Sequence, residues 1–174
     1  MSTVEASPLE AMAGNATLLR AMIGAVDSCF GMCDMQARCV GMSAVPMRDP
    51  GKITGMIGLH GQVSGFITVN MSEQVAMKAI GGLLGESFEQ VTPQVVDGAG
   101  EMTNIIAGGV KNALSGTPWS FSHVTVPSVI IGQNYQIAYA GGLEYVAAAF
   151  EHQDRETLML DDRLLQVAIS LIRL

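Results

Sequence analysis

The pattern of apolar and polar positions predicts one long amphipathic helix in the middle of the chain, from Thr92 to Gly116. Thr92 is a favourable N-cap residue, Pro93 suits the first helical position, and Gly116 and Pro118 mark the end of the helix. At helical spacing, the polar positions that share one face are Asp97, Glu101, Asn104, Gly108, Lys111, Asn112 and Ser115. The opposite face is apolar. This helix is therefore predicted to bury its apolar side in a core and to leave its polar side available for contact.

The interior of the same helix contains four glycines, at Gly98, Gly100, Gly108 and Gly109. Each costs about 0.5–1 kcal/mol relative to alanine in a helix, so their presence needs a reason. Glycine allows another surface to come close. The residues therefore leave two interpretations open: a docking face for a partner, or close packing of a second helix.

The chain before this helix is predicted to form two further helices and three strands. Apolar residues at helical spacing predict a first helix from Ala16 to about Asp34. The other elements are a strand from Cys39 to Met47, a hairpin of Ile53–Leu59 and Val63–Val69, and a helix from Glu73 to Leu84 capped by Ser72. Residues 1–15 are predicted to be a flexible or partly helical lead-in to a single domain that spans residues 16–174.

The chain after the central helix is predicted to be mostly strand. The predicted strands are Trp119–Val126, Ser128–Ile131, Tyr135–Tyr139 and Tyr145–Phe150. Alternation between residues 164 and 174 favours a last strand there, with a helix as the alternative. Because hairpins outnumber crossover units, we expect an α+β fold with one antiparallel sheet and long helices packed on a face.

Composition narrows the classes of partner. The chain has 174 residues, of which 49% are hydrophobic and 14% charged, and a formal net charge of −7. A negative chain is poorly suited to nucleic acid, whose phosphates require a basic surface. Charged residues interrupt every apolar window long enough to cross a bilayer, and the N-terminus does not resemble a signal peptide. We therefore expect a cytoplasmic protein without membrane insertion, and its low charge content favours a homodimer.

Cysteine and histidine do not form a recognisable site in the sequence. Three cysteines without zinc spacing are predicted to be free, buried thiols, and no metal site is expected. His60, at the predicted hairpin tip, is interpreted as a solvated turn residue, with a catalytic base as the alternative. The cysteines are Cys29, Cys33 and Cys39, and the other histidines are His123 and His152.

The polar face of the central helix holds the best candidate chemistry. Glu101 and Asn104 are three residues apart and share that face. An amide cannot act as a strong base but can orient a water molecule, which suffices when the electrophile is already activated, as in an acyl phosphate. Glu101 can bind a lysine of a partner. The pair Asp97 and Glu101 offers acid–base catalysis as an alternative, although solvent screening weakens it.

The arrangement Asp97-x3-Glu101-x2-Asn104-x22-Pro127 resembles the signature of the CheC, CheX and FliY family of chemotaxis phosphatases. The continuation after Asn104 and the preceding glycine-bearing hairpin and capped helix are also similar to that family. The likeness extends over residues 53–151. Neither of the other two predicted helices offers a second acidic-x2-Asn step, so the chain is most similar to the CheX type, which has one site.

This resemblance implies a CheC-like fold, a homodimer with one site per subunit, and hydrolysis of the phospho-aspartate of a CheY-like response regulator. By position, Asn104 would orient the attacking water and Glu101 would contact the regulator, with its active-site lysine as the expected partner. Asp97, Gly108 and Lys111 would contribute to partner binding, and Pro127 would have a structural role. No cofactor of its own is implied, because Mg²⁺ is expected in the regulator. The alternatives are a non-catalytic CheX-like or CheC-like adapter that binds a receiver domain or a flagellar-switch component, and an unrelated domain.

Overall fold

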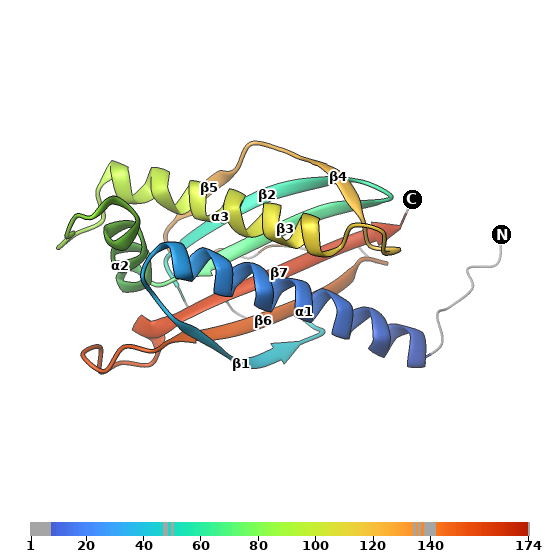
Figure 1. The fold of residues 1–174 in the computed structure, drawn as a ribbon, viewed down its shortest axis with the longest axis horizontal. Helices are drawn as coiled ribbons and strands as arrows, with labels where there is room; N and C mark the ends of the chain where they lie inside the picture. Colours follow the sequence, from blue (N-terminus) through green and yellow to red (C-terminus); the bar gives the residue numbers. More distant parts are fainter. Residues whose placement is uncertain are drawn as a thin grey trace.

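The computed structural model describes residues 8–46, 49, 51–133, 135, 137 and 142–173, with side chains from residue 14 onward. The helices are α1 (Pro8–Met32), α2 (Glu73–Leu84), α3 (Pro93–Ala113) and the short 3₁₀ helix η1 (Asp161–Arg163). The strands are β1 (Ala37–Ser43), β2 (Ile53–Gly61), β3 (Val63–Met71), β4 (Phe121–Val124), β5 (Ser128–Ile131), β6 (Glu144–His152) and β7 (Leu164–Arg173). Figure 1 shows α1 and α3 lying across one face of the sheet, with α2 at one end.

The strands form one antiparallel sheet in the order β1-β6-β7-β3-β2, and both β4 and β5 pair with the outer edge of β2. Strand β4 pairs near the end of β2, from Leu59 to Gly61, whereas β5 pairs near its start, from Ile53 to Met56. Residues 125–127 therefore bridge the two short strands along the side of α3, as an arch in Figure 1. This arch, residues 125–127, is called the β4–β5 connection below.

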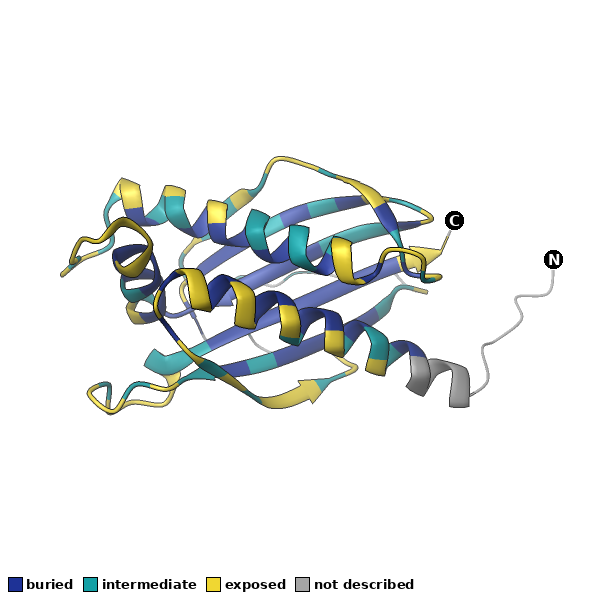
Figure 2. Ribbon diagram, in the orientation of Figure 1, coloured by how far each residue is buried: buried dark blue, intermediate teal, exposed yellow. Residues whose placement is uncertain are grey.

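The core lies between the sheet and the two long helices. Figure 2 shows the inward faces of α1 and α3 buried and their outward faces exposed. Met102, Ile106 and Val110 of α3 are fully buried. Gly55 in β2 allows α3 to approach the sheet closely, because a side chain there would overlap that of Thr103. Burial of apolar surface thus fixes which side of α3 faces outward.

The opposite face of the sheet carries a buried polar network near the start of β2. The Asn70 amide nitrogen donates to Thr54 Oγ1 at 2.8 Å and to the Gly51 carbonyl oxygen at 3.0 Å, and Asn70 Oδ1 accepts from the Gly51 backbone nitrogen at 2.7 Å. Tyr135 bonds the Thr54 hydroxyl, and its own hydroxyl donates to Asp49 at 3.3 Å. Burial raises the pKa of both Asp49 and Tyr135. The network provides hydrogen-bond partners for buried polar groups on this face of the sheet and holds the segment that precedes β2 in place.

Most predicted elements are present, with differences at their ends. The predicted hairpin, the capped helix α2 and a strand at the C-terminal end are confirmed. Helix α1 begins at Pro8, earlier than the predicted Ala16, because its first turns are rich in helix-favouring alanine but poor in large apolar residues. Strand β1 ends at Ser43 instead of Met47, and β4 occupies only four of the positions predicted from Trp119 to Val126.

Two predictions remain open. Most of the strand predicted over 135–139 lies outside the described residues, and the division between a lead-in at 1–15 and a domain at 16–174 stays a prediction. None of the helices in the described ranges combines the length and hydropathy that a membrane-spanning segment requires.

Candidate functional site

Helix α3 is built locally as its sequence predicts. The Thr92 hydroxyl accepts a hydrogen bond from the Val95 backbone nitrogen at 3.3 Å, and Pro93 occupies the first turn. Lys111 lies in the last turn, where a positive charge interacts favourably with the helix dipole. The helix ends at Ala113, and Gly116 follows with a φ of 74°, a conformation that favours glycine.

The outward face of α3 presents a row of five residues, which we call the α3 stripe: Asp97, Glu101, Asn104, Gly108 and Lys111. They are spaced four, three, four and three residues apart, so they lie along one side of the helix over about 21 Å. The two acidic side chains are exposed, and the other three residues are half-buried. The structure thus brings all five predicted site residues onto one continuous surface.

Glu101 and Asn104 are adjacent on this stripe and are available for binding. A spacing of three residues on a helix places their Cβ atoms about 5–6 Å apart. Among the residues that the structure describes, neither side chain has a hydrogen-bond or ion-pair partner. The stripe therefore offers one carboxylate and one neutral amide, side by side, with their bonding capacity unused.

The four glycines of α3 serve different purposes. A Cβ atom on Gly98 would lie 2.5 Å from Ile80 Cδ1 of α2, and one on Gly109 would lie 2.9 Å from Ala25 Cβ of α1. These two glycines therefore allow helix packing. A Cβ atom on Gly108 would meet nothing within 4 Å, so Gly108 faces open space in the stripe. Helix packing is therefore confirmed as the reason for Gly98 and Gly109, whereas a docking role for Gly108 stays a prediction.

The β4–β5 connection flanks the stripe and was not predicted as part of the site. A Cβ atom on Gly100 would lie 3.4 Å from Val129 Cγ2 and 3.9 Å from Pro127 Cγ, so the connection lies against α3 one turn before Asn104. Val126, at its centre, is 85% exposed. Pro127 was the one sequence signal that linked this connection to the site, because it belongs to the same spacing motif as Glu101 and Asn104. Nothing in the sequence showed that Val126 would be exposed.

A shallow polar hollow of about 440 Å³ continues the stripe at the C-terminal end of α3. Lys111 and Asn112 line it from the helix, Ser115 lines it from the turn that follows, and Gln62 and Ser120 line it from the segments next to the strands. Ser120 donates a hydrogen bond to Gln62 at 2.9 Å. The hollow adds polar groups to the surface beside the stripe.

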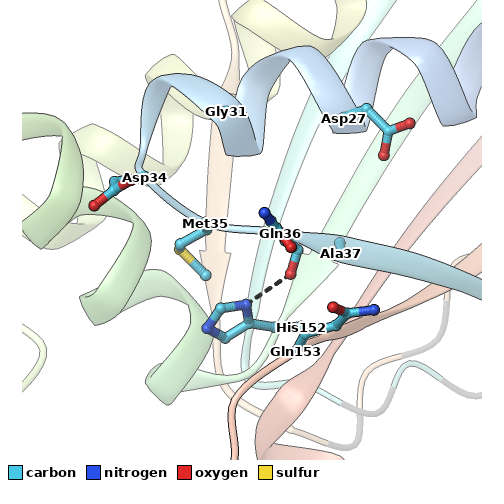
Figure 3. A pocket seen from close by; sticks show the side chains of 8 residues that line it. All are labelled: Asp27, Gly31, Asp34, Met35, Gln36, Ala37, His152 and Gln153. Atoms are coloured by element: carbon cyan, nitrogen blue, oxygen red, sulfur yellow. Dashed lines mark hydrogen bonds between the residues drawn. The ribbon is translucent and has the colours of Figure 1, made fainter.

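A second hollow, of about 650 Å³, lies between α1 and the β1 edge, away from α3 (Figure 3). His152 Nδ1 donates to the Gln36 carbonyl oxygen at 2.9 Å, which leaves Nε2 as an acceptor. Figure 3 shows Asp27 and Asp34 at opposite ends of the hollow, with neither carboxylate directed at His152. Within the described ranges, no three His, Cys, Asp or Glu side chains gather as metal ligands. This hollow therefore lacks a converging set of reactive groups.

The cysteines lie apart from the stripe. Cys29 on α1 and Cys33 in the turn after it are buried, as predicted, whereas Cys39 in β1 is only half-buried. A hydrogen bond with Cys33, together with burial, raises the pKa of the Cys29 thiol. The prediction of buried thiols was wrong for Cys39, because β1 is an edge strand with fewer neighbours over it.

A protein-family model matches the part of the chain that contains this surface. The family model described as "Chemotaxis phosphatase CheX" matches residues 53–151, more than half of the chain. The chain belongs to the CheX family. The match extends from β2 into β6, so it includes the whole α3 stripe and the β4–β5 connection. No curated protein matches the chain.

Solved structures show the same CheX fold. The chemotaxis protein CheX from Vibrio vulnificus matches with a TM-score of 0.74 and 20% identity, over 89% of this chain and 99% of the other. A CheC-like superfamily protein from Shewanella sp. PV-4 matches with a TM-score of 0.74 and 22% identity, over 90% and 97%. The CheX–CheY–BeF₃–Mg²⁺ complex from Borrelia burgdorferi matches with a TM-score of 0.68 and 21% identity, over 90% and 96%.

Proposed function

We propose that this CheX-family protein hydrolyses the phospho-aspartate of a CheY-like response regulator. The observation that carries the proposal is the pair Glu101 and Asn104, which lie next to each other on an open helical face and have unused bonding capacity among the described residues. Membership of a family described as chemotaxis phosphatases supports this reaction. The similarity to a CheX solved in complex with CheY supports the class of partner.

In this mechanism α3 supplies positioning and the regulator supplies activation. An acyl phosphate held beside Mg²⁺ in the regulator is already electrophilic, so hydrolysis requires a water molecule placed in line with the phosphorus atom. The Asn104 side-chain oxygen accepts a hydrogen bond from that water and fixes its direction. Correct placement of a reactant contributes several kcal/mol to catalysis, without a titrating group on this chain.

Glu101 binds the regulator and so holds its phospho-aspartate where Asn104 can position the water. Its carboxylate is exposed one turn before Asn104 and binds a cationic side chain of the regulator, for which the active-site lysine is the natural candidate. Docking makes this contact less accessible to water. The contact therefore contributes more binding free energy than an ordinary surface ion pair does. The division of roles is therefore Glu101 for binding and Asn104 for the chemical step.

The surface around the pair is shaped for close approach. Gly108 presents no side chain one turn beyond Asn104, and Val126 is exposed on the β4–β5 connection, which lies against α3 at Gly100. Lys111 and the polar hollow beside it extend the contact surface, and Asp97 extends it at the opposite end. We propose that the regulator covers this area, with Val126 contacting apolar surface next to the regulator's phosphorylation site.

Two measurements on the same proteins test the proposal and separate it from an adapter role. Receiver domains from the same genome are phosphorylated with a small-molecule phosphodonor, and inorganic phosphate release is followed with and without this protein. Binding is measured to the same receivers loaded with BeF₃⁻ and Mg²⁺. We expect one receiver both to bind and to lose phosphate faster. Binding without faster hydrolysis would establish the adapter, and neither effect with any receiver would refute both roles.

A further inference from the structure

Two histidines far apart in the sequence face each other at the end of the sheet. His60 of β2 and His123 of β4 are directly paired in the antiparallel register. Directly opposite residues in such a pair point to the same face of the sheet, with Cβ atoms about 4.5–5.5 Å apart. Both side chains are exposed. The two imidazoles therefore lie side by side on the surface and are open to solvent.

A β-bulge sets this pairing. The register between β2 and β4 shifts between His60 and Gly61, and the partners of these two residues are His123 and Phe121. Ser122 is therefore the extra residue, and it lies with His123 opposite His60. Bulges redirect side chains, and here the bulge brings the Ser122 hydroxyl to both histidines.

The Ser122 hydroxyl is an outer hydrogen-bond partner for the His123 ring. The Ser122 hydroxyl donates to the His60 carbonyl oxygen at 3.5 Å, which uses its only hydrogen. The Ser122 hydroxyl oxygen also lies 2.8 Å from His123 Nδ1, close enough to accept a hydrogen bond from the ring. The Nδ1–H tautomer of His123 makes this bond and leaves a lone pair on Nε2 for a ligand.

His60 has a matching arrangement. Its Nδ1 lies 2.9 Å from the hydroxyl oxygen of Ser64, across the β2–β3 turn. Donation from Nδ1–H to that oxygen leaves Nε2 free here as well. A histidine that binds a metal usually donates its other ring nitrogen to an oxygen partner, which fixes the tautomer and the ring orientation. Both histidines have this outer partner in place.

We propose that His60 and His123 form a surface binding site for a divalent transition-metal ion of the kind that favours imidazole, namely Ni²⁺, Cu²⁺ or Zn²⁺. The two Nε2 atoms would be the protein ligands, and water would complete the coordination. Neutral imidazole suits these ions, and their affinity for nitrogen ligands exceeds that of Mn²⁺ or Fe²⁺. Because the ligands come from two strands, the ion would cross-link β4 to β2. This site is separate from the α3 stripe and does not depend on the proposed phosphatase activity.

Titration calorimetry with Ni²⁺ tests this site, using the full chain without a histidine tag. We expect one Ni²⁺ per chain in the wild type. His60→Gln and His123→Gln should each raise the dissociation constant at least tenfold, whereas the matched control His152→Gln should leave it unchanged. Removal of an outer-shell partner typically weakens metal binding about 10–100-fold, so Ser122→Ala should weaken it within that range.

Thermal unfolding provides a second readout that does not rely on calorimetry. An ion that binds only the folded state raises the melting temperature, so Ni²⁺ should raise it for the wild type and for His152→Gln but not for His123→Gln. Equal melting temperatures of all variants without metal would show that each is folded. The proposal is overturned if about 100 µM Ni²⁺ does not bind, or if binding persists unchanged in His60→Gln and His123→Gln.

Discussion

At the scale of single residues, Glu101 and Asn104 have separate proposed roles. Glu101→Ala removes a charge-assisted contact with the regulator and leaves the fold intact, because the side chain is exposed and has no partner among the described residues. We expect at least tenfold weaker binding to a BeF₃⁻-loaded receiver, equal to about 1.4 kcal/mol. Glu89→Ala, an exposed glutamate outside the stripe, is the control and should bind as the wild type does.

Val126 gives a second test at this scale, because the structure rather than the sequence pointed to it. The side chain is 85% exposed on the β4–β5 connection, so replacement by aspartate should not disturb the fold. A new charge in an apolar contact carries a desolvation cost, and we expect at least tenfold weaker receiver binding. Calorimetry measures this, and unchanged affinity would remove the connection from the docking surface.

At the scale of secondary structure, two neighbouring glycines of α3 should respond in opposite ways to the same substitution. Gly109→Leu overfills the contact with Ala25 and should lower the free energy of unfolding by about 1–3 kcal/mol. Gly108→Leu enters open space, so the fold should be retained, but the raised surface should weaken receiver binding at least tenfold. Denaturant unfolding and calorimetry on both variants measure these effects. Unchanged binding by Gly108→Leu would contradict the docking role of that position.

Much of this element-level picture could be predicted, because capping residues and periodicity are local. Thr92, Pro93 and Ser72 mark helix starts by chemistry that acts within a turn, and the structure confirms each of them. The separate roles of Gly98, Gly108 and Gly109 could not be predicted, because they depend on which helix packs against which side of α3. That information is in the tertiary structure and not in the spacing of residues.

The candidate site, too, could be predicted from the sequence only in part. The motif from Asp97 to Pro127 identified the stripe, since helical spacing alone places its members on one face. The proximity of Pro127 to Gly100 and the pairing of His60 with His123 arise from long-range strand pairing. His60 was interpreted as a turn residue on the local pattern, and its position in β2 opposite another histidine required the sheet.

At the scale of the whole molecule, we predict a homodimer. The chain is low in charge, and β1 forms one edge of the sheet with Val40 45% and Met42 49% exposed. No strand pairs with the outer edge of β1 among the described residues, and an edge strand with exposed apolar side chains is an unfavourable surface for a monomer. Sedimentation velocity at micromolar concentration should therefore give about twice the mass of the 174-residue chain. A single species with the mass of one chain would contradict this prediction.

The central claim is that Asn104 orients the water that attacks the phospho-aspartate. Its most direct test is the rate of phosphate loss from a saturating complex of the phosphorylated receiver with Asn104→Ala, compared with the wild type. We expect a rate at least about 100-fold lower, with receiver affinity unchanged, because only placement of the water is lost. Asn15→Ala on α1 makes the same chemical change away from the stripe and should hydrolyse at the wild-type rate. Wild-type hydrolysis by the Asn104→Ala protein would show that Asn104 does not position the attacking water.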